Sequence, residues 1–335
     1  TTGTNNTGLG HSALRANTTG LYNSAVGESS LLANTSGQYN VAMGRLTLQA
    51  NTTGASNTAL GSIALYGNTT GNYNVAVGEN CLQANTTASN NTGVGRQALA
   101  LNTTGAANTA MGYGALFDNT TGASNVAIGH EAMQNNTTAS FNVAIGVDAL
   151  YTNTTGASNT AVGEAALDAN TTADNNTAVG RDALGANTTG ADNVAVGYQA
   201  LSTATAGSAN VAVGGEALAA NTAINNTAVG HKSAYTNTTG TQNSALGTYS
   251  LYANTSGDFN VAFGYNTLSS NTTADNNTAV GSYSLDANTT GADNVAVGKN
   301  SLAANTTASN NTAVGTSTLL DNTTGASNTA MGHNS

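Results

Sequence analysis

One 17-residue unit, repeated along the whole chain, constrains this sequence more than any other feature. The unit is clearest at 153–169, Asn-Thr-Thr-Gly-Ala-Ser-Asn-Thr-Ala-Val-Gly-Glu-Ala-Ala-Leu-Asp-Ala, and its columns are numbered here 1 to 17 from Asn153 to Ala169. Twenty copies account for all 335 residues: the first lacks column 1, the copy beginning at Asn221 lacks one residue, and the last stops at column 14. A short fixed period indicates a solenoid, in which each copy stacks only on its neighbours.

The bulk composition excludes several classes of protein. Lys and Arg together number six and the net charge is −10, so the chain has no basic footprint for nucleic acid or for an anionic membrane surface. No apolar run is long enough to cross a bilayer. Charged residues are only 7% of the chain, but its apolar residues recur in fixed columns, which a disordered low-complexity chain has no reason to do.

The chain begins and ends inside a copy of the unit, and neither terminal copy has the atypical sequence of a capping rung. We therefore expect residues 1–335 to form a single repeat solenoid domain that is a fragment of a longer chain. The single cysteine, Cys81, lies in column 14 among Ala, Ser and Thr, and is interpreted as a small buried side chain outside any disulfide framework.

Two columns never vary. Column 11 is Gly in all twenty copies, which indicates a corner where no Cβ fits, and column 7 is Asn in all twenty. Asn tolerates left-handed backbone, and Asn amides stacked from rung to rung can hydrogen-bond along the axis as a ladder. Column 1, which is Asn except at Ala204, predicts a second ladder. The representative turn and ladder residues selected here are Asn23, Asn40, Asn57, Asn159, Asn193, Gly27, Gly44, Gly61, Gly163 and Gly197.

Columns 8 to 10 predict a short strand. Column 8 is Val, Thr or Ser, column 9 is Ala or rarely Gly, and column 10 is a larger apolar residue. Alternation places columns 8 and 10 on one face, which we expect to point inward, and the uniformly small column 9 on a second packing face. Column 15 is Leu except at Met133 and Ala234, and is expected to point inward from a second short strand or a bend.

These columns predict an all-β fold, a parallel β-solenoid or β-roll of about 20 rungs. Helix is disfavoured because Asn-Thr-Thr-Gly and the invariant Gly are poor helix formers, and the absence of Pro suits strands paired to both neighbouring rungs. Each rung would bury only about three substantial apolar side chains, so a lone rod would be marginal. We therefore expect several copies to associate side by side.

Column 4 is Gly in most copies but Ala in six, and in five of those six the residue at column 6 becomes Asn. Ala139 is the exception, with Phe141 at column 6. We interpret this as two solutions to one tight turn, in which either Gly takes the positive-φ position or the position moves to Asn.

No catalytic residue, metal site or cofactor is predicted, and enzyme activity is not expected. The four histidines, His11, His130, His231 and His333, all lie in the outward column 12, many rungs apart, with no cysteine or acidic cluster expected beside them. Asp residues in the turn columns 5 and 6 leave weak calcium binding open, although the pattern of calcium-binding repeats is missing.

The Asn-Thr-Thr corner has two further interpretations. It matches the N-glycosylation acceptor, but a glycan and an internal ladder on the same Asn exclude each other, and we favour the ladder. Thr at columns 2 and 3 also raises ice binding. Adjacent columns face apart, and column 8 is interpreted as inward, so only one outward file of hydroxyls is expected instead of the pair that ice-binding solenoids use.

Aromatic residues lie almost entirely outside the predicted core columns. With so little charge nearby, they suit contacts with sugars, with matrix or with neighbouring copies, and the sequence does not choose between these. The residues selected as surface contacts are Tyr22, Tyr39, Tyr73, Phe141, Tyr66, Phe117, Tyr151 and Tyr252.

The pattern Asn-Val-Ala-Val-Gly-x-x-x-Leu at 193–201 and 294–302 resembles the head repeats of trimeric autotransporter adhesins. With Asn-Thr-Thr-Gly between strands, it is also similar to repeats of bacterial and phage tail-fibre-like proteins. The resemblance covers the whole chain, although the family head repeat is usually shorter. It implies a left-handed β-roll wound as a homotrimer on a cell surface or virion.

The function predicted from these features is that of a structural and adhesive extracellular fibre, a rigid shaft that mediates surface attachment or filament formation. Its expected partners are copies of itself and a host surface, matrix or glycans, with no nucleic acid and no membrane insertion within this segment. A phage tail-fibre shaft is the alternative, and an ice-binding solenoid is the second alternative.

Overall fold

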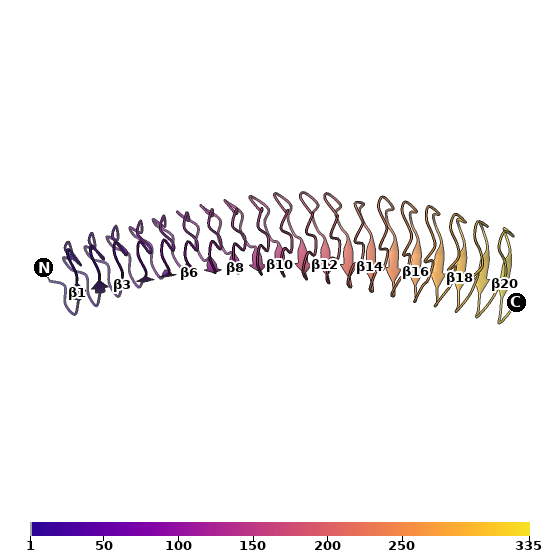
Figure 1. Cartoon of the computed structure of the whole chain (residues 1–335), viewed down its shortest axis with the longest axis horizontal. Coiled ribbons are helices and arrows are strands. Elements are labelled where there is room, and N and C mark those ends of the chain that lie inside the picture. The colour runs from indigo at the N-terminus through magenta and orange to yellow at the C-terminus, as the bar shows by residue number, and fades with distance from the viewer. Residues whose placement is uncertain (1) are drawn as a thin grey trace. The chain divides into compact units, whose positions relative to one another are not determined.

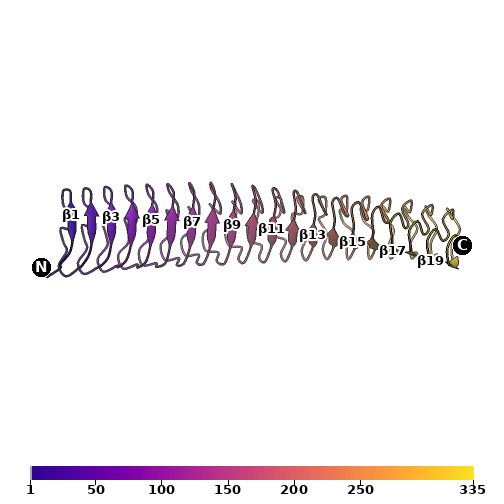
Figure 2. The same ribbon diagram turned by 90° about the horizontal axis from the view of Figure 1, so that it is seen from below.

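The computed structural model describes residues 2–335, and these contain strands and turns but no helix. The chain separates into two compact units, Thr1–Thr172 and Ala173–Ser335, called here the N-terminal and C-terminal units. In each unit, every copy of the repeat forms one rung with one three-residue strand (Figures 1 and 2). The prediction of an all-β parallel β-solenoid with 17-residue rungs is confirmed.

The strands of the N-terminal unit are β1 (Thr7–Leu9), β2 (Ser24–Val26), β3 (Val41–Met43), β4 (Thr58–Leu60), β5 (Val75–Val77), β6 (Thr92–Val94), β7 (Thr109–Met111), β8 (Val126–Ile128), β9 (Val143–Ile145) and β10 (Thr160–Val162). Those of the C-terminal unit are β11 (Thr177–Val179), β12 (Val194–Val196), β13 (Val211–Val213), β14 (Thr227–Val229), β15 (Ser244–Leu246), β16 (Val261–Phe263), β17 (Thr278–Val280), β18 (Val295–Val297), β19 (Thr312–Val314) and β20 (Thr329–Met331).

Neighbouring strands within each unit pair in parallel, column on column. Ala25 pairs with Ala42 in the N-terminal unit, and Ala195 pairs with Ala212 in the C-terminal unit. The hydrogen bonding continues around the rung beyond the strands: the backbone N–H of Thr52 donates to the carbonyl of Thr69 at 2.9 Å. Pairing along so much of the perimeter explains why the sequence has no proline, which would remove a donor.

The face assignment within the strand is the reverse of our expectation. Alanines of column 9 are buried, whereas columns 8 and 10 point outward, with Met43 48% exposed and Leu246 50% exposed. The interior is too narrow for larger side chains on the strand, because column 9 packs against columns 14 and 15. A Cβ built on Gly8 would lie 3.7 Å from Leu14 Cδ1. Most rungs therefore bury one large apolar side chain where about three were expected.

Columns 13 to 15 form a bend, one of the two options that the sequence left open. Column 15 is buried as expected, but its leucines have left-handed backbone, for example Leu48 with φ 52° and Leu65 with φ 52°. Left-handed backbone costs a non-glycine residue roughly 1–2 kcal/mol. Complete burial of a leucine contributes about 2 kcal/mol and offsets that cost.

The invariant Gly of column 11 has the steric cause that its invariance implied. Gly61 has φ 128°, and a Cβ on it would lie 2.6 Å from the carbonyl oxygen of Gly78 in the next rung. The left-handed backbone expected at the Asn of column 7 lies instead at column 6. It lies there in both kinds of copy, with Ser56 at φ 57° after Gly54 and Asn90 at φ 63° after an alanine. The interpretation of two alternative turns is therefore wrong.

Candidate functional site

The buried Asn amides of columns 1 and 7 form two ladders of hydrogen bonds within each unit, and these ladders connect neighbouring rungs. In column 7, the backbone N–H and Nδ2 of Asn57 both donate to Oδ1 of Asn40, at 3.0 and 3.1 Å, and Nδ2 also donates to the carbonyl of Gly71. In column 1, Asn51 Nδ2 donates to Asn34 Oδ1 at 2.8 Å. These amides are fully buried, so the ladder leaves the column 1 amides no room for a glycan.

The structure places the residues selected from the sequence as follows. Column 7 of the ladder contains Asn23, Asn40, Asn57, Asn159 and Asn193, all buried. The positive-φ corner of column 11 contains Gly27, Gly44, Gly61, Gly163 and Gly197.

Column 3 provides one exposed file of hydroxyls beside these ladders, while column 2 uses its own hydroxyls internally. Thr35 Oγ1, in column 2, donates to the carbonyl of Thr52 at 3.0 Å. Thr53 and Thr155, in column 3, are exposed. The turn therefore presents a single polar line to solvent.

The largest candidate contact surface is the outer sheet face, defined as the side chains of columns 8 and 10. No copy has a charged residue in either column. Column 8 is mostly half-buried, and column 10 ranges from half-buried to exposed. The column 10 residues of the N-terminal unit are Leu9, Val26, Met43, Leu60, Val77, Val94, Met111, Ile128, Ile145 and Val162. Those of the C-terminal unit are Val179, Val196, Val213, Val229, Leu246, Phe263, Val280, Val297, Val314 and Met331.

The aromatic residues selected as surface contacts all reach solvent. Five of them are exposed and three are half-buried. The exposed residues are Tyr22, Tyr39, Tyr73, Phe141 and Tyr66, and the half-buried ones are Phe117, Tyr151 and Tyr252. The structure brings Tyr22 and Tyr39 together as a parallel stack with ring centroids 5.1 Å apart.

A group of tyrosines in the C-terminal unit was not selected from the sequence as a cluster. Tyr235 stacks on Tyr252 at 5.5 Å, and Tyr249 contacts Tyr252 and Tyr265 edge to face. Tyr283 extends the group, and partial desolvation, followed by the electrostatic effect of the neighbouring Tyr265, raises the pKa of Tyr283. The signal was available, because four successive copies, beginning at Asn221, Asn237, Asn254 and Asn271, each contain Tyr in column 12, 13 or 16.

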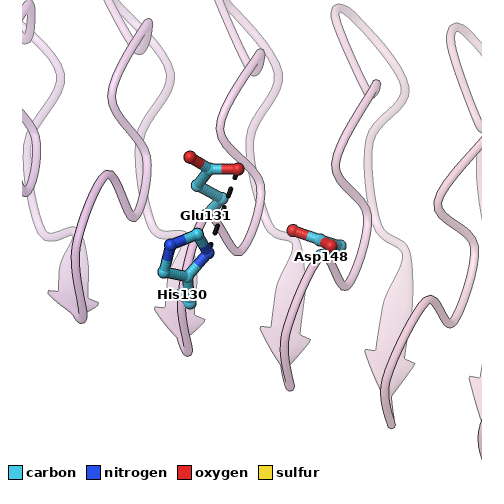
Figure 3. Close-up of side chains that lie close together, drawn as sticks. All are labelled: His130, Glu131 and Asp148. Carbon is cyan, nitrogen blue, oxygen red and sulfur yellow. Dashed lines mark ion pairs between the residues drawn. The ribbon is translucent and has the colours of Figure 1, made fainter.

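The structure brings one histidine together with two carboxylates, in contrast to the expectation that no acidic cluster lies beside the histidines. His130 and Glu131 follow β8, and Asp148 follows β9 in the next rung (Figure 3). Their ligand atoms all lie within 4.8 Å of one another, and His130 Nδ1 is 3.9 Å from Glu131 Oε2. Within residues 2–335, no other group of three His, Cys, Asp or Glu lies this close together.

The remaining histidines have other surroundings. His231 Nδ1 lies 3.1 Å from the carbonyl of Gly215, and its ring contacts Tyr249. Its neighbour Lys232 forms an ion pair with Glu216 at 3.5 Å. His11 and His333 are exposed.

Cys81 is fully buried, and desolvation raises the pKa of its thiol to about 12. Its sulfur occupies space that column 9 normally fills: a Cβ built on Gly93 would lie 2.5 Å from Cys81 Sγ. Gly93 is thus explained by its neighbour, and Cys81 is a core residue shielded from solvent.

No protein-family model matches this chain, and no curated protein is similar to it. Among residues 2–335, no helix is long and apolar enough to cross a membrane.

Proposed function

We propose that this chain is a structural and adhesive segment of an extracellular fibre, and that copies associate through the outer sheet face. The observation that carries the proposal is this uncharged face, which is apolar at column 10 and carries Val, Thr or Ser at column 8 on every rung of both units. Exposed apolar patches above a few hundred Å² are rare on soluble monomers and mark interaction surfaces.

The face is long enough to form an interface. Ten rungs of one unit present twenty uncharged side chains from columns 8 and 10, comparable to the roughly 20–30 residues that each partner contributes to a standard interface. Association costs roughly 4–15 kcal/mol, so the strength of the contact depends on how well these side chains pack against the partner and does not follow from area alone.

The finer features of the proposal come from the resemblance to trimeric adhesin heads. They are three copies, a left-handed winding, and an outer sheet face from each copy directed toward a common axis. The exposed Thr file and the aromatic side chains would then remain on the outside as a repetitive, weakly multivalent flank for host surface, matrix or glycans. A tail-fibre shaft on a virion would use the same association.

Ice binding is the second candidate, and one observation favours it. Column 8 was interpreted as inward but points outward, so Thr at column 8 and the residue at column 10 form paired files at alternate positions. Protruding side chains at column 10, such as Met43 and Phe263, make that face uneven and favour a protein partner. Thermal hysteresis of the purified chain would support ice binding, and a flat result would dismiss it.

Disulfide trapping tests the association. In a Cys81→Ala background, Ile145→Cys places a thiol at column 10, and Thr155→Cys places one at the exposed column 3 as the matched control. We expect mild oxidation to link copies through Ile145→Cys and to leave Thr155→Cys as single chains. Equal yields from the two variants would contradict association through the outer sheet face.

A further inference from the structure

The register of the solenoid creates a mixed nitrogen and oxygen ligand set from two neighbouring rungs. His130 and Glu131 occupy columns 12 and 13 of one copy, and Asp148 occupies column 13 of the next. Figure 3 shows the three side chains close together on the same flank of the N-terminal unit. Tyr113, in the preceding rung, stacks on the His130 ring with centroids 5.3 Å apart.

The surroundings of this cluster favour a cation. A hollow of 320 Å³ is lined by Glu131, Asp148, Tyr151 and Asp168, so a third carboxylate faces the same space. Residues 97–172 contain five Asp or Glu and neither Lys nor Arg. Arg96, just outside this stretch, lies over the Tyr113 ring, 5.7 Å from its centroid, and forms its ion pair with Glu79 at 3.3 Å.

We propose that His130, Glu131 and Asp148 bind a divalent transition-metal ion of the zinc class. Ligand atoms of one tetrahedral zinc are about 3.4 Å apart, given metal–ligand distances near 2.1 Å. The three ligand atoms here lie within 4.8 Å of one another, so side-chain rotations that shorten their separations by at most about 1.4 Å bring them into range. The imidazole selects zinc over calcium or magnesium, which prefer oxygen ligands alone.

The bound ion would clamp two rungs of the N-terminal unit and retain open coordination positions for water or for a donor from a partner. The inference is independent of the proposed self-association, because the cluster lies in columns 12 and 13 and not on the outer sheet face.

Calorimetric titration of the untagged full chain with zinc chloride tests the site, with calcium chloride titrated in parallel. We expect one zinc per chain, at least tenfold weaker binding in His130→Ala and in Asp148→Asn, and weaker binding of calcium than of zinc. His231→Ala is the matched control, because His231 occupies the same column without a carboxylate pair, and it should bind zinc like the wild type.

Three results would overturn the proposal: no zinc binding, equal affinity in His130→Ala and the wild type, or calcium binding as tight as zinc binding. A rise in the unfolding midpoint with zinc, present in His231→Ala and lost in His130→Ala, is the second readout. Circular dichroism establishes that each variant is folded.

Discussion

The contact between Cys81 and Gly93 offers a sharp test of the inward face. Gly93 stands in column 9, where other copies except the first have Ala, and a Cβ there would meet Cys81 Sγ at 2.5 Å. The two residues should therefore be coupled. Replacing both, as Cys81→Ala with Gly93→Ala, would reproduce the Ala98 and Ala110 pair found one rung further along.

The magnitudes follow from volume. Cys81→Ala removes one buried sulfur beside a glycine and should cost about 1 kcal/mol through the cavity it leaves. Gly93→Ala overfills the same space and should cost about 1–3 kcal/mol. In the double variant the new methyl occupies the cavity and alanine is favoured over glycine in a strand by roughly 0.5–1 kcal/mol, so its stability should match or exceed that of the wild type.

Guanidinium denaturation of the four chains at one protein concentration measures this cycle. We expect a coupling free energy of about 2–4 kcal/mol between the two positions, which is the sum of the two single costs when the double variant is as stable as the wild type. Additive effects, within about 0.5 kcal/mol, would refute the assignment of column 9 to the interior.

Three further outcomes are expected. In the ladder interrupted at Ala204, Asn187 Oδ1 accepts the backbone N–H of Gly190 from its own turn. Ala204→Asn should restore the ladder and stabilise the fold by about 1 kcal/mol, which raises the unfolding midpoint; a lower midpoint would count against the ladder. Gly146→Ala should lower the unfolding midpoint strongly, because Gly146 has φ 140° and a Cβ there would lie 2.4 Å from the carbonyl oxygen of Gly163. A wild-type midpoint would show that this corner tolerates a side chain. Cys81 should resist thiol reagents in the folded chain, and because its pKa rises from 9.0 to about 12 on folding, its contribution to stability should be lost as pH rises above about 9; rapid labelling of the folded chain would contradict its burial.

The repeat period predicted the class of fold, the glycine corner at column 11 and the two Asn ladders, but alternation alone could not decide which face of the strand points inward. Alternation requires columns 8 and 10 to share a face of the three-residue strand. It does not show whether that face packs against the core or against a partner. The left-handed backbone of the column 15 leucines could not be predicted either. The sequence does not show that burial of the Leu48 side chain outweighs the free-energy cost of its positive φ.

The cluster around His130 was readable in principle. Aligning the copies places Glu131 and Asp148 in the column after His130, in the same rung and the next. A comparison of the histidines with one another misses this group, because its carboxylates lie in the neighbouring column of the same and the adjacent copy. In a solenoid, residues 17 apart in sequence are spatial neighbours, so a site is found by reading down columns.

The mass of the untagged chain in solution, measured by sedimentation over a wide concentration range, tests the central claim most directly. Association through the outer sheet face predicts a stable multiple of the 32.9 kDa chain, with three copies for the adhesin-like arrangement. A folded monomer at every concentration would contradict the account, because the uncharged apolar face would then remain in water along both units.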